Sequence, residues 1–243
     1  MIGWRARLGF LVPPGNPTVE PEMTALTPKG VSLHFARMEA SGQTGSLAGQ
    51  EERNRQQLAG LDHTIELLAL VRPSVVVMAH TATSYTLGIA AEAELTARIE
   101  RQHGLRFLTA FGSVIAALEH LQVTRLAFGT PYGMDTTLRG KALLEAHQLD
   151  IVSFGNLPGV QNIYDETAER AYALGRQVDH PDAQAIFISG VGMPTIETID
   201  ALECDLGKPV ISAASAMMWN ALRTAGVREP VPGYGRLLEG GRM

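Results

Sequence analysis

Two short apolar runs, each ending in small polar residues, constrain the fold of this chain more than any other feature. The first run covers residues 75–79 and leads into His80 and Thr81. The second covers residues 185–188 and leads into Ser189. Short runs that are apolar throughout are typical of parallel strands buried on both faces. Because open α/β sheets bind ligands at the carboxyl ends of such strands, the two run ends are the expected walls of a site.

Strand-like and helix-like segments alternate along the whole chain, and the pattern restarts near Arg125. The expected strands are residues 7–12, 31–38, 75–79, 106–109, 125–129, 150–154, 185–189 and 210–212. Helical periodicity lies between them, as over residues 58–68. This predicts an α/β fold of two similar lobes related by a pseudo-twofold axis, each a parallel sheet flanked by helices, with the active site in the cleft between them. We expect residues 1–115, completed by 214–243, to form lobe one and residues 116–213 to form lobe two.

Two segments show neither a strand pattern nor a helix pattern. Residues 39–49 are rich in Ser, Gly and Gln and lie next to the expected ligand edge, so they form either a lid or a plain connector. Residues 228–243 are rich in Gly and Pro, and we expect them to be loosely packed.

Composition excludes several classes of function. The chain has 243 residues, a formal net charge of −5 and one cysteine, Cys204. It has no evident basic face, so we do not expect nucleic acid as a partner. Its apolar runs are too short to cross a bilayer, and no signal-peptide core precedes the first strand, so we expect no membrane partner. A single cysteine rules out an intrachain disulfide and indicates a reducing, cytoplasmic location.

Motifs for common cofactors and nucleophiles are missing from the chain. Residues 190–195 resemble the start of a dinucleotide-binding fingerprint, but they lack its third glycine and the acidic residue that follows it. The chain contains no P-loop, no His-Glu-x-x-His and no Gly-x-Ser-x-Gly, and its seven histidines are scattered singly. We therefore expect neither a bound cofactor nor a metal.

A polar constellation remains at the expected strand ends. Its members are Asn16, His80, Thr81, Ser84, Tyr85, Tyr132, Ser189, Gly190 and Val191. Taken singly, Asn16 and Thr81 are well explained as helix caps, with Pro17 just inside the first helix, and Tyr85 could simply pack in a wall. Taken together at matching edges of two repeats, these hydroxyl, amide and backbone N–H groups predict a carboxylate site.

Several segments resemble the aspartate/glutamate racemase superfamily, in the branch that contains maleate cis–trans isomerase and arylmalonate decarboxylase. They are residues 12–22 (VPPGNPTVEPE), 130–132 (TPY), 206–212 (LGKPVIS), 219–223 (WNALR) and Asn162 with the three residues before it. The resemblance covers residues 7–226. It implies cofactor-free carbon-acid chemistry on a small carboxylate or dicarboxylate, a homo-oligomer, and a substrate-binding role for Asn162.

The resemblance also implies a cysteine after the third strand of each lobe, of which arylmalonate decarboxylase keeps only the second. His80 and Gly190 stand at these two positions, and Cys204, in a helix, cannot replace either thiol. Gly190 offers no acid or base, whereas His80 is a good proton donor or acceptor near neutral pH but a poor carbon nucleophile. The residues favour one-sided chemistry with His80 and Tyr132 as the catalytic residues. In it, Asn16, Tyr132, Asn162 and backbone N–H groups hold the carboxylate while His80 transfers one proton.

Three functions follow from this pattern. We favour a decarboxylase-like lyase, because decarboxylation needs only one acid and a pocket that disfavours the charge of the leaving carboxylate. The alternative enzyme is a maleate-type cis–trans isomerase, hydratase or tautomerase. The third possibility is a non-catalytic carboxylate-binding protein, in which His80 would be structural.

Overall fold

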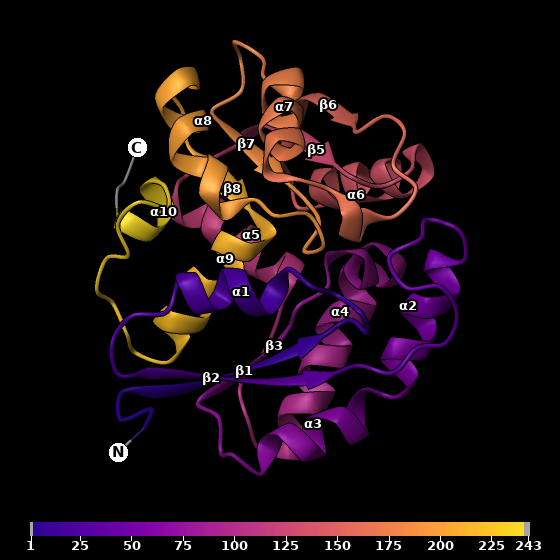
Figure 1. Ribbon diagram of the computed structural model, residues 1–243, viewed down its shortest axis with the longest axis vertical. Helices are drawn as coiled ribbons and strands as arrows, with labels where there is room; N and C mark the ends of the chain where they lie inside the picture. Colours follow the sequence, from indigo (N-terminus) through magenta and orange to yellow (C-terminus); the bar gives the residue numbers. More distant parts are fainter. Residues whose placement is uncertain (1, 241–243) are drawn as a thin grey trace.

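The computed structural model describes residues 2–240, and it folds into two lobes that each contain a four-stranded parallel sheet (Figure 1). The first sheet contains β1 (Ala6–Val12), β2 (Val31–Arg37), β3 (Val75–Met78) and β4 (Phe107–Thr109). The second contains β5 (Arg125–Thr130), β6 (Asp150–Asn156), β7 (Ala185–Ile188) and β8 (Val210–Ser212). The strand orders, β2-β1-β3-β4 and β6-β5-β7-β8, are the same. The predicted fold of two similar α/β lobes is confirmed.

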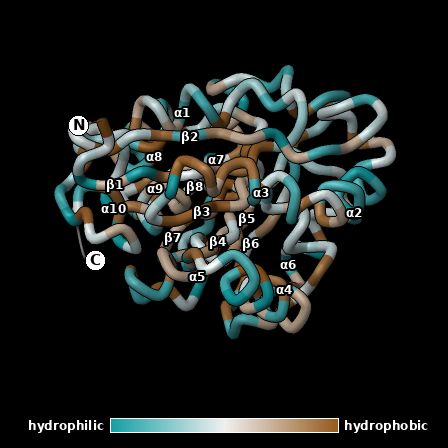
Figure 2. Tube along the Cα trace, turned by 90° about the horizontal axis from the view of Figure 1, so that it is seen from below, coloured by the Kyte–Doolittle hydropathy of each residue, from teal (hydrophilic) through white to brown (hydrophobic). Residues whose placement is uncertain are grey.

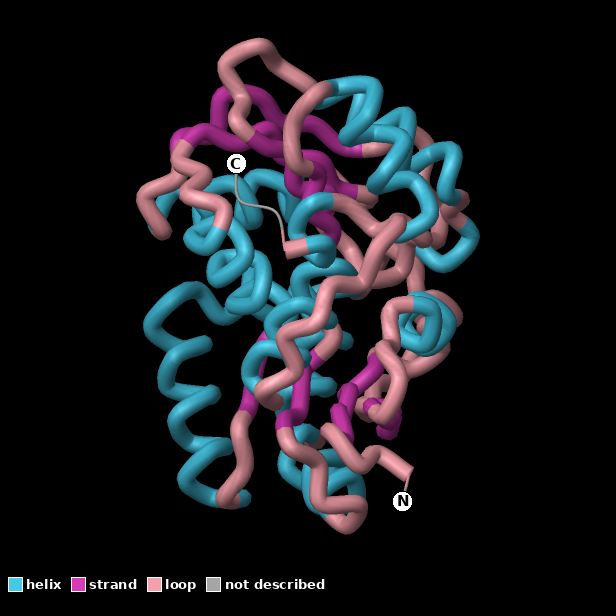
Figure 3. Tube along the Cα trace, turned by 90° about the vertical axis from the view of Figure 1, so that its left-hand side faces the viewer, coloured by secondary structure: helices cyan, strands magenta, loops and turns pink. Residues whose placement is uncertain are grey.

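Helices lie between the sheets and on their outer faces. They are α1 (Val19–Ala25), α2 (Gln50–Ala59), α3 (Leu61–Ala69), α4 (Thr81–His103), α5 (Ala110–His120), α6 (Met134–Ala146), α7 (Ala168–Val178), α8 (Ile199–Leu206), α9 (Ala213–Thr224) and α10 (Arg236–Glu239), with short 3-10 turns at Ile163–Asp165 and Ile196–Thr198. Figure 1 shows α1, α5 and α9 between the two sheets, and the side view of Figure 3 shows the strands in two separate groups. Helix α9 contacts β1 and β3 of the first sheet, but the lobe limits near residues 115 and 214 stay a prediction.

The apolar run of β3 is explained by cores on both sides of its sheet. Val75 and Val77 pack into the large core that spans both lobes, whereas Val76 and Met78 pack into a smaller core beneath α3 and α4. All four side chains are fully buried, so the strand has no solvent-facing position for a polar residue. Figure 2 shows the same distribution, with hydrophobic colour on the inner strands and hydrophilic colour on the outer helices and loops.

Two helix limits differ from the prediction. The periodicity over residues 58–68 is divided at Gly60 between α2 and α3. Helix α1 begins at Val19 rather than directly after Asn16. The N-cap residue is Thr18 rather than the predicted Asn16, although Asn16 Oδ1 accepts the backbone N–H of Thr18 at 2.8 Å and of Val19 at 3.0 Å.

The prediction of a loosely packed tail is wrong for residues 228–240. Val231, Leu237 and Leu238 are buried, and the last two lie on α10, which packs against α9. Three apolar side chains are enough to hold this Gly- and Pro-rich segment on the core. Residues 241–243 lie outside the described residues. Within the described part of the chain, no helix combines the length and apolarity needed to span a membrane.

Candidate active site

Strand β3 delivers His80 to the N-terminus of α4, where it is the N-cap residue. Its carbonyl accepts the Thr83 hydroxyl at 2.7 Å, which holds the backbone in an extended conformation with a φ of −154°. The side chain is 6% exposed, and Nδ1 has no hydrogen-bond partner among the described residues. A buried polar atom without a partner costs free energy, and a ligand contact is one explanation for such an exception.

The electrostatic surroundings of His80 keep its ring neutral. Burial and, to a smaller extent, the positive charge of Arg53 together lower the pKa of His80 from 6.5 to about 4. A neutral imidazole can accept a proton directly. To donate a proton to carbon, it must first take one up together with the substrate.

Four hydroxyl groups from both lobes form a continuous row at the strand ends. Thr81 Oγ1 lies 3.2 Å from the hydroxyl of Tyr132 and accepts the Ser189 hydroxyl at 3.4 Å. The Tyr85 hydroxyl lies 2.7 Å from Ser189 Oγ, and all four side chains are buried. Burial raises the pKa of both tyrosines above the usual range, so both phenols stay protonated. Tyr85 uses its O–H on Ser189, whereas Tyr132 can donate to an anionic oxygen when Thr81 donates to it.

Ser84 does not join this row of hydroxyl groups. Its hydroxyl donates to Glu92 Oε1 at 2.7 Å, and both side chains are buried. Residues eight apart lie about 12 Å apart along a straight helix, so this contact depends on a kink. The kink is at Gly88, whose φ of 74° and ψ of 172° are not helical.

The segment after β1 is hydrogen-bonded to the segment after β7. Asn16 Nδ2 donates to the Val191 carbonyl at 3.1 Å, and Thr18 Oγ1 donates to the Gly192 carbonyl at 2.9 Å. All of these polar groups are buried. An amide NH₂ group carries two donors, so Asn16 retains one N–H for a ligand.

Glu22 extends the same contact along α1. Its Oε1 accepts the backbone N–H of Thr195 at 2.5 Å and of Ile196 at 3.0 Å, while Oε2 is buried without a partner among the described residues. Burial raises the pKa of Glu22 from 4.5 to about 7, although the two N–H groups act in the opposite direction. We did not predict Thr18 or Glu22 as site residues. The signal available in the sequence was their spacing of four residues, which puts both side chains on one helix face.

Gly190 has a backbone that is suited to glycine. Its φ is +96°, and an added Cβ would lie 2.8 Å from Pro131 Cγ and 3.5 Å from the Tyr132 hydroxyl. L-amino acids with a side chain rarely adopt this conformation. Position 190, where the family resemblance implies a cysteine, therefore presents backbone rather than a proton-transferring side chain.

Residues 39–49 bridge the two lobes beside these strand ends. Ser46 forms an isolated antiparallel bridge with Asn162, whose Nδ2 donates to the Thr44 carbonyl at 3.4 Å. The backbone N–H of Ile163 donates to the Gly45 carbonyl at 2.9 Å. These contacts join the segment to the second lobe, and its role as a lid or a plain connector stays a prediction.

Cavities adjoin the site on two sides. One, of about 240 Å³, is lined in part by Ala82 and Tyr85. The other, of about 490 Å³, is lined in part by Thr18, Glu22 and Tyr164. Across residues 2–240, no group of three or more His, Cys, Asp or Glu side chains is placed to hold a metal ion.

Comparison with known proteins identifies the family. The sequence model of arylmalonate decarboxylase matches residues 8–238. The chain belongs to the arylmalonate decarboxylase family. The maleate isomerase of Nocardia farcinica is 31% identical over 241 residues, which cover 96% of this chain and 95% of that protein. The arylmalonate decarboxylase of Bordetella bronchiseptica is 33% identical over 171 residues, which cover 68% of this chain and 71% of that protein.

A solved structure of a family relative has the same fold. It is a variant of the maleate cis–trans isomerase of Nocardia farcinica with a covalently bound succinylcysteine intermediate. The TM-score is 0.88 at 26% sequence identity, and the match covers 97% of this chain and 99% of that one. The predicted superfamily branch is confirmed, and so is the prediction of an enzyme of the lyase or isomerase type.

The structure brings most of the predicted site residues together. Those at the strand ends are Asn16, His80, Thr81, Tyr85, Tyr132, Ser189, Gly190 and Val191. Asn162 reaches the site through residues 44–46, and Ser84 is engaged with Glu92 instead. Their roles in binding and catalysis stay predictions.

Proposed function

We propose that this family member is a cofactor-independent lyase that decarboxylates a small dicarboxylate, with His80 as the proton-transferring group. The observation that carries the proposal is the unpartnered Nδ1 of buried His80, in a site whose second face is Gly190. Thr81 follows His80, and Ser189 precedes Gly190. The hydroxyl oxygens of Thr81 and Ser189 are 3.4 Å apart, so His80 and Gly190 lie on either side of one hydrogen bond. The relatives, named for maleate and arylmalonate, support a dicarboxylate as the substrate class.

The proposed reaction needs one proton for each turnover. The bond from the central carbon to one carboxylate breaks, CO₂ leaves, and the electron pair is delocalised over the retained carboxylate as an enediolate. The Tyr132 hydroxyl, which accepts a hydrogen bond from Thr81, donates its own to this developing charge. The protonated His80 ring then gives its proton to carbon and takes up another with the next substrate.

The low pKa of His80 gives the proposal a pH signature. The ring is neutral in the free protein, and the bound dianion stabilises the imidazolium form after proton uptake. Because productive binding requires one proton that the free enzyme lacks, kcat/KM should fall about tenfold for each pH unit above neutrality.

The same neutral ring favours a second candidate, an isomerase or tautomerase. A neutral His80 could remove a proton from one carbon and return it to another without net proton uptake. In that case kcat/KM should be flat near neutral pH and fall only as the pH approaches about 4, where the ring becomes protonated.

NMR analysis of products in D₂O tests the proposal. Substituted malonates should lose CO₂ and gain one deuterium, whereas deuterium without mass loss would indicate a tautomerase. His80→Ala should lower turnover by at least about 100-fold, the usual contribution of a positioned acid or base. His63→Ala, on the exposed face of α3, is the matched control. Unchanged turnover in His80→Ala would exclude the mechanism, and binding without turnover across the panel would favour a carboxylate-binding protein.

A further inference from the structure

Arg53 lies on the first turns of α2, and its guanidinium folds back onto the lid segment. Nη1 donates to the Ala48 carbonyl at 2.7 Å, and Nη2 donates to the Ser46 carbonyl. Ser46 is the residue that pairs with Asn162 of the other lobe. The charged end of Arg53 is therefore held next to the predicted substrate-binding asparagine.

The guanidinium is half-buried and has no carboxylate partner among residues 2–240. Its hydrogen bonds to Ala48 and Ser46 use two of its five N–H donors. Arg37 also approaches this region, but it is paired with Glu20 at 2.8 Å. Burying a cation without a counter-charge costs free energy, and an anionic ligand would offset that cost.

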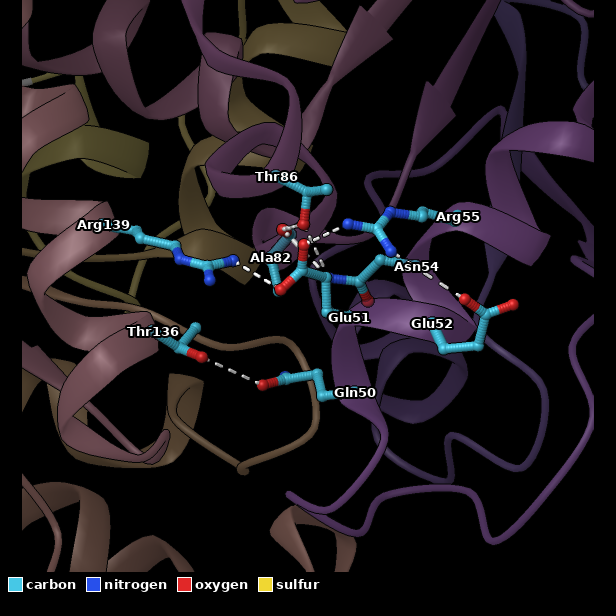
Figure 4. A network of polar contacts seen from close by, with 9 residues as sticks. All are labelled: Gln50, Glu51, Glu52, Asn54, Arg55, Ala82, Thr86, Thr136 and Arg139. Carbon is cyan, nitrogen blue, oxygen red and sulfur yellow. Dashed lines mark hydrogen bonds and ion pairs between the residues drawn. The ribbon is translucent and has the colours of Figure 1, made fainter.

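Arg55, two residues further along α2, is paired with carboxylates, unlike Arg53. Figure 4 shows Arg55 with Glu51 and Glu52, its two acidic partners, and Glu51 also pairs with Arg139 of α6 at 2.8 Å. This network lies beside the cavity lined by Tyr85, and its Glu51–Arg139 ion pair joins α2 to α6 of the second lobe. The positive charge of Arg55 is thus balanced within the protein, and that of Arg53 is not.

Arg53 is also within electrostatic range of two residues that line the candidate site. Its charge acts on His80 after β3 and on Tyr164 in the segment that follows Asn162. Within this cluster, the other hydrogen-bond donors are uncharged hydroxyl and amide groups. A buried carboxylate is held best by charge-assisted hydrogen bonds, and a guanidinium can bind both of its oxygens.

We infer that Arg53 recognises one of the two carboxylates of the substrate, so that it selects dianions over monoanions of the same shape. This inference rests on the proposed function, because it assumes that the substrate lies between His80 and Asn162. It adds a residue that no segment of the family resemblance contains. It also gives the lid a chemical role, since Ser46 and Ala48 hold the guanidinium through their carbonyl groups.

Titration calorimetry with pairs of ligands that differ by one charge tests the inference. The probes are malonate with malonamate and succinate with succinamate. Wild-type protein should bind a dianion at least about tenfold more tightly than its monoamide, and Arg53→Gln should remove that preference. Arg53→Lys, which keeps the charge, should retain part of it. Arg55→Gln is the matched control on the same helix and should retain all of it.

The preference ratio is informative because partial misfolding lowers both affinities together. An Arg53→Gln protein that keeps the wild-type ratio would overturn the role of Arg53. So would wild-type protein that binds neither dianion, and CO₂ release from malonates would then leave the proposed function standing. A third outcome is charge-dependent binding that is lost in Arg53→Gln, together with no CO₂ release by wild-type protein. This outcome would support the role of Arg53 in binding and exclude the lyase.

Discussion

The hydroxyl oxygen of Tyr85, on α4 of the first lobe, lies 2.7 Å from the hydroxyl oxygen of Ser189, which follows β7 in the second lobe. Tyr85 is 7% exposed and Ser189 is fully buried, so the bond is shielded from water. Ser189 also donates to Thr81 at 3.4 Å, which links it to the residue next to His80. The ends of β3 and β7 thus form one polar site shared by both lobes.

A double-mutant cycle on Tyr85 and Ser189 tests this link. Tyr85→Phe and Ser189→Ala should each destabilise the protein by about 1–2 kcal/mol, because each leaves a buried hydroxyl without its partner. Their coupling energy, measured by urea unfolding, should be about 1 kcal/mol. Tyr172 on α7 is partly buried and donates to Asp205, far from Ser189 in the sequence, so Tyr172→Phe should be additive with Ser189→Ala. Full additivity of the first pair would contradict the link.

Substitution of two glycines within residues 39–49 distinguishes the effect of backbone strain from the effect of lost contact with the second lobe. Gly42 and Gly45 both have positive φ, 91° and 77°, but an added Cβ meets nothing within 4 Å at Gly42. At Gly45 it would overlap Oδ1 of Asn162 and lie 2.5 Å from Cδ2 of Tyr164. Gly45→Ala should therefore displace the segment, weaken dicarboxylate binding about tenfold, and speed limited proteolysis within residues 39–49.

Gly42→Ala is the control for these effects. It carries the cost of a side chain at positive φ, about 1 kcal/mol, without the contact with Asn162. Equal proteolysis rates and equal affinities in the two variants would show that residues 39–49 do not close on the second lobe.

Glu22 and His80 should make opposite contributions to stability on acidification. The pKa of Glu22 is raised to about 7 in the folded state, so its contribution grows as the pH falls from 7 towards 4.5. The pKa of His80 is lowered to about 4, so its contribution is lost as the pH falls from 6.5 towards 4. In the wild-type protein the two changes largely cancel.

Substitution of either residue should make the pH dependence contributed by the other one measurable. When the pH falls from 8 to 5, the unfolding free energy of Glu22→Gln should end about 2 kcal/mol lower than the wild-type change alone would leave it. That of His80→Asn should end higher by about as much. Urea unfolding at the two pH values measures both. Glu20→Gln, on the more exposed side of α1, is the control. A pH dependence that is the same in Glu22→Gln and wild type would show that Glu22 is not buried as a charged group.

The sequence predicts the fold well because the fold depends on local patterns. Short apolar runs such as residues 75–79 are visible as strands, and the restart near Arg125 marks the second lobe. The polar residues at the strand ends are visible for the same reason, since parallel strands deliver their carboxyl ends to one edge.

The remaining features depend on contacts between distant segments. Arg53 is one of several charged residues on α2, and only the folded chain brings it beside Asn162 and His80. The engagement of Ser84 with Glu92 requires the kink at Gly88, which glycine permits but does not dictate. The buried part of the tail follows from three apolar residues within a segment whose composition indicates a loop.

The most direct test of one-sided proton transfer is the stereochemistry of decarboxylation. The substrate is a malonate that carries two different substituents on its central carbon, and the reaction is run in D₂O. Because His80 can protonate the enediolate from one face and Gly190 offers no donor on the other, the product should be a single enantiomer with one deuterium. A racemic product, or a single enantiomer formed equally fast by His80→Ala, would contradict the account.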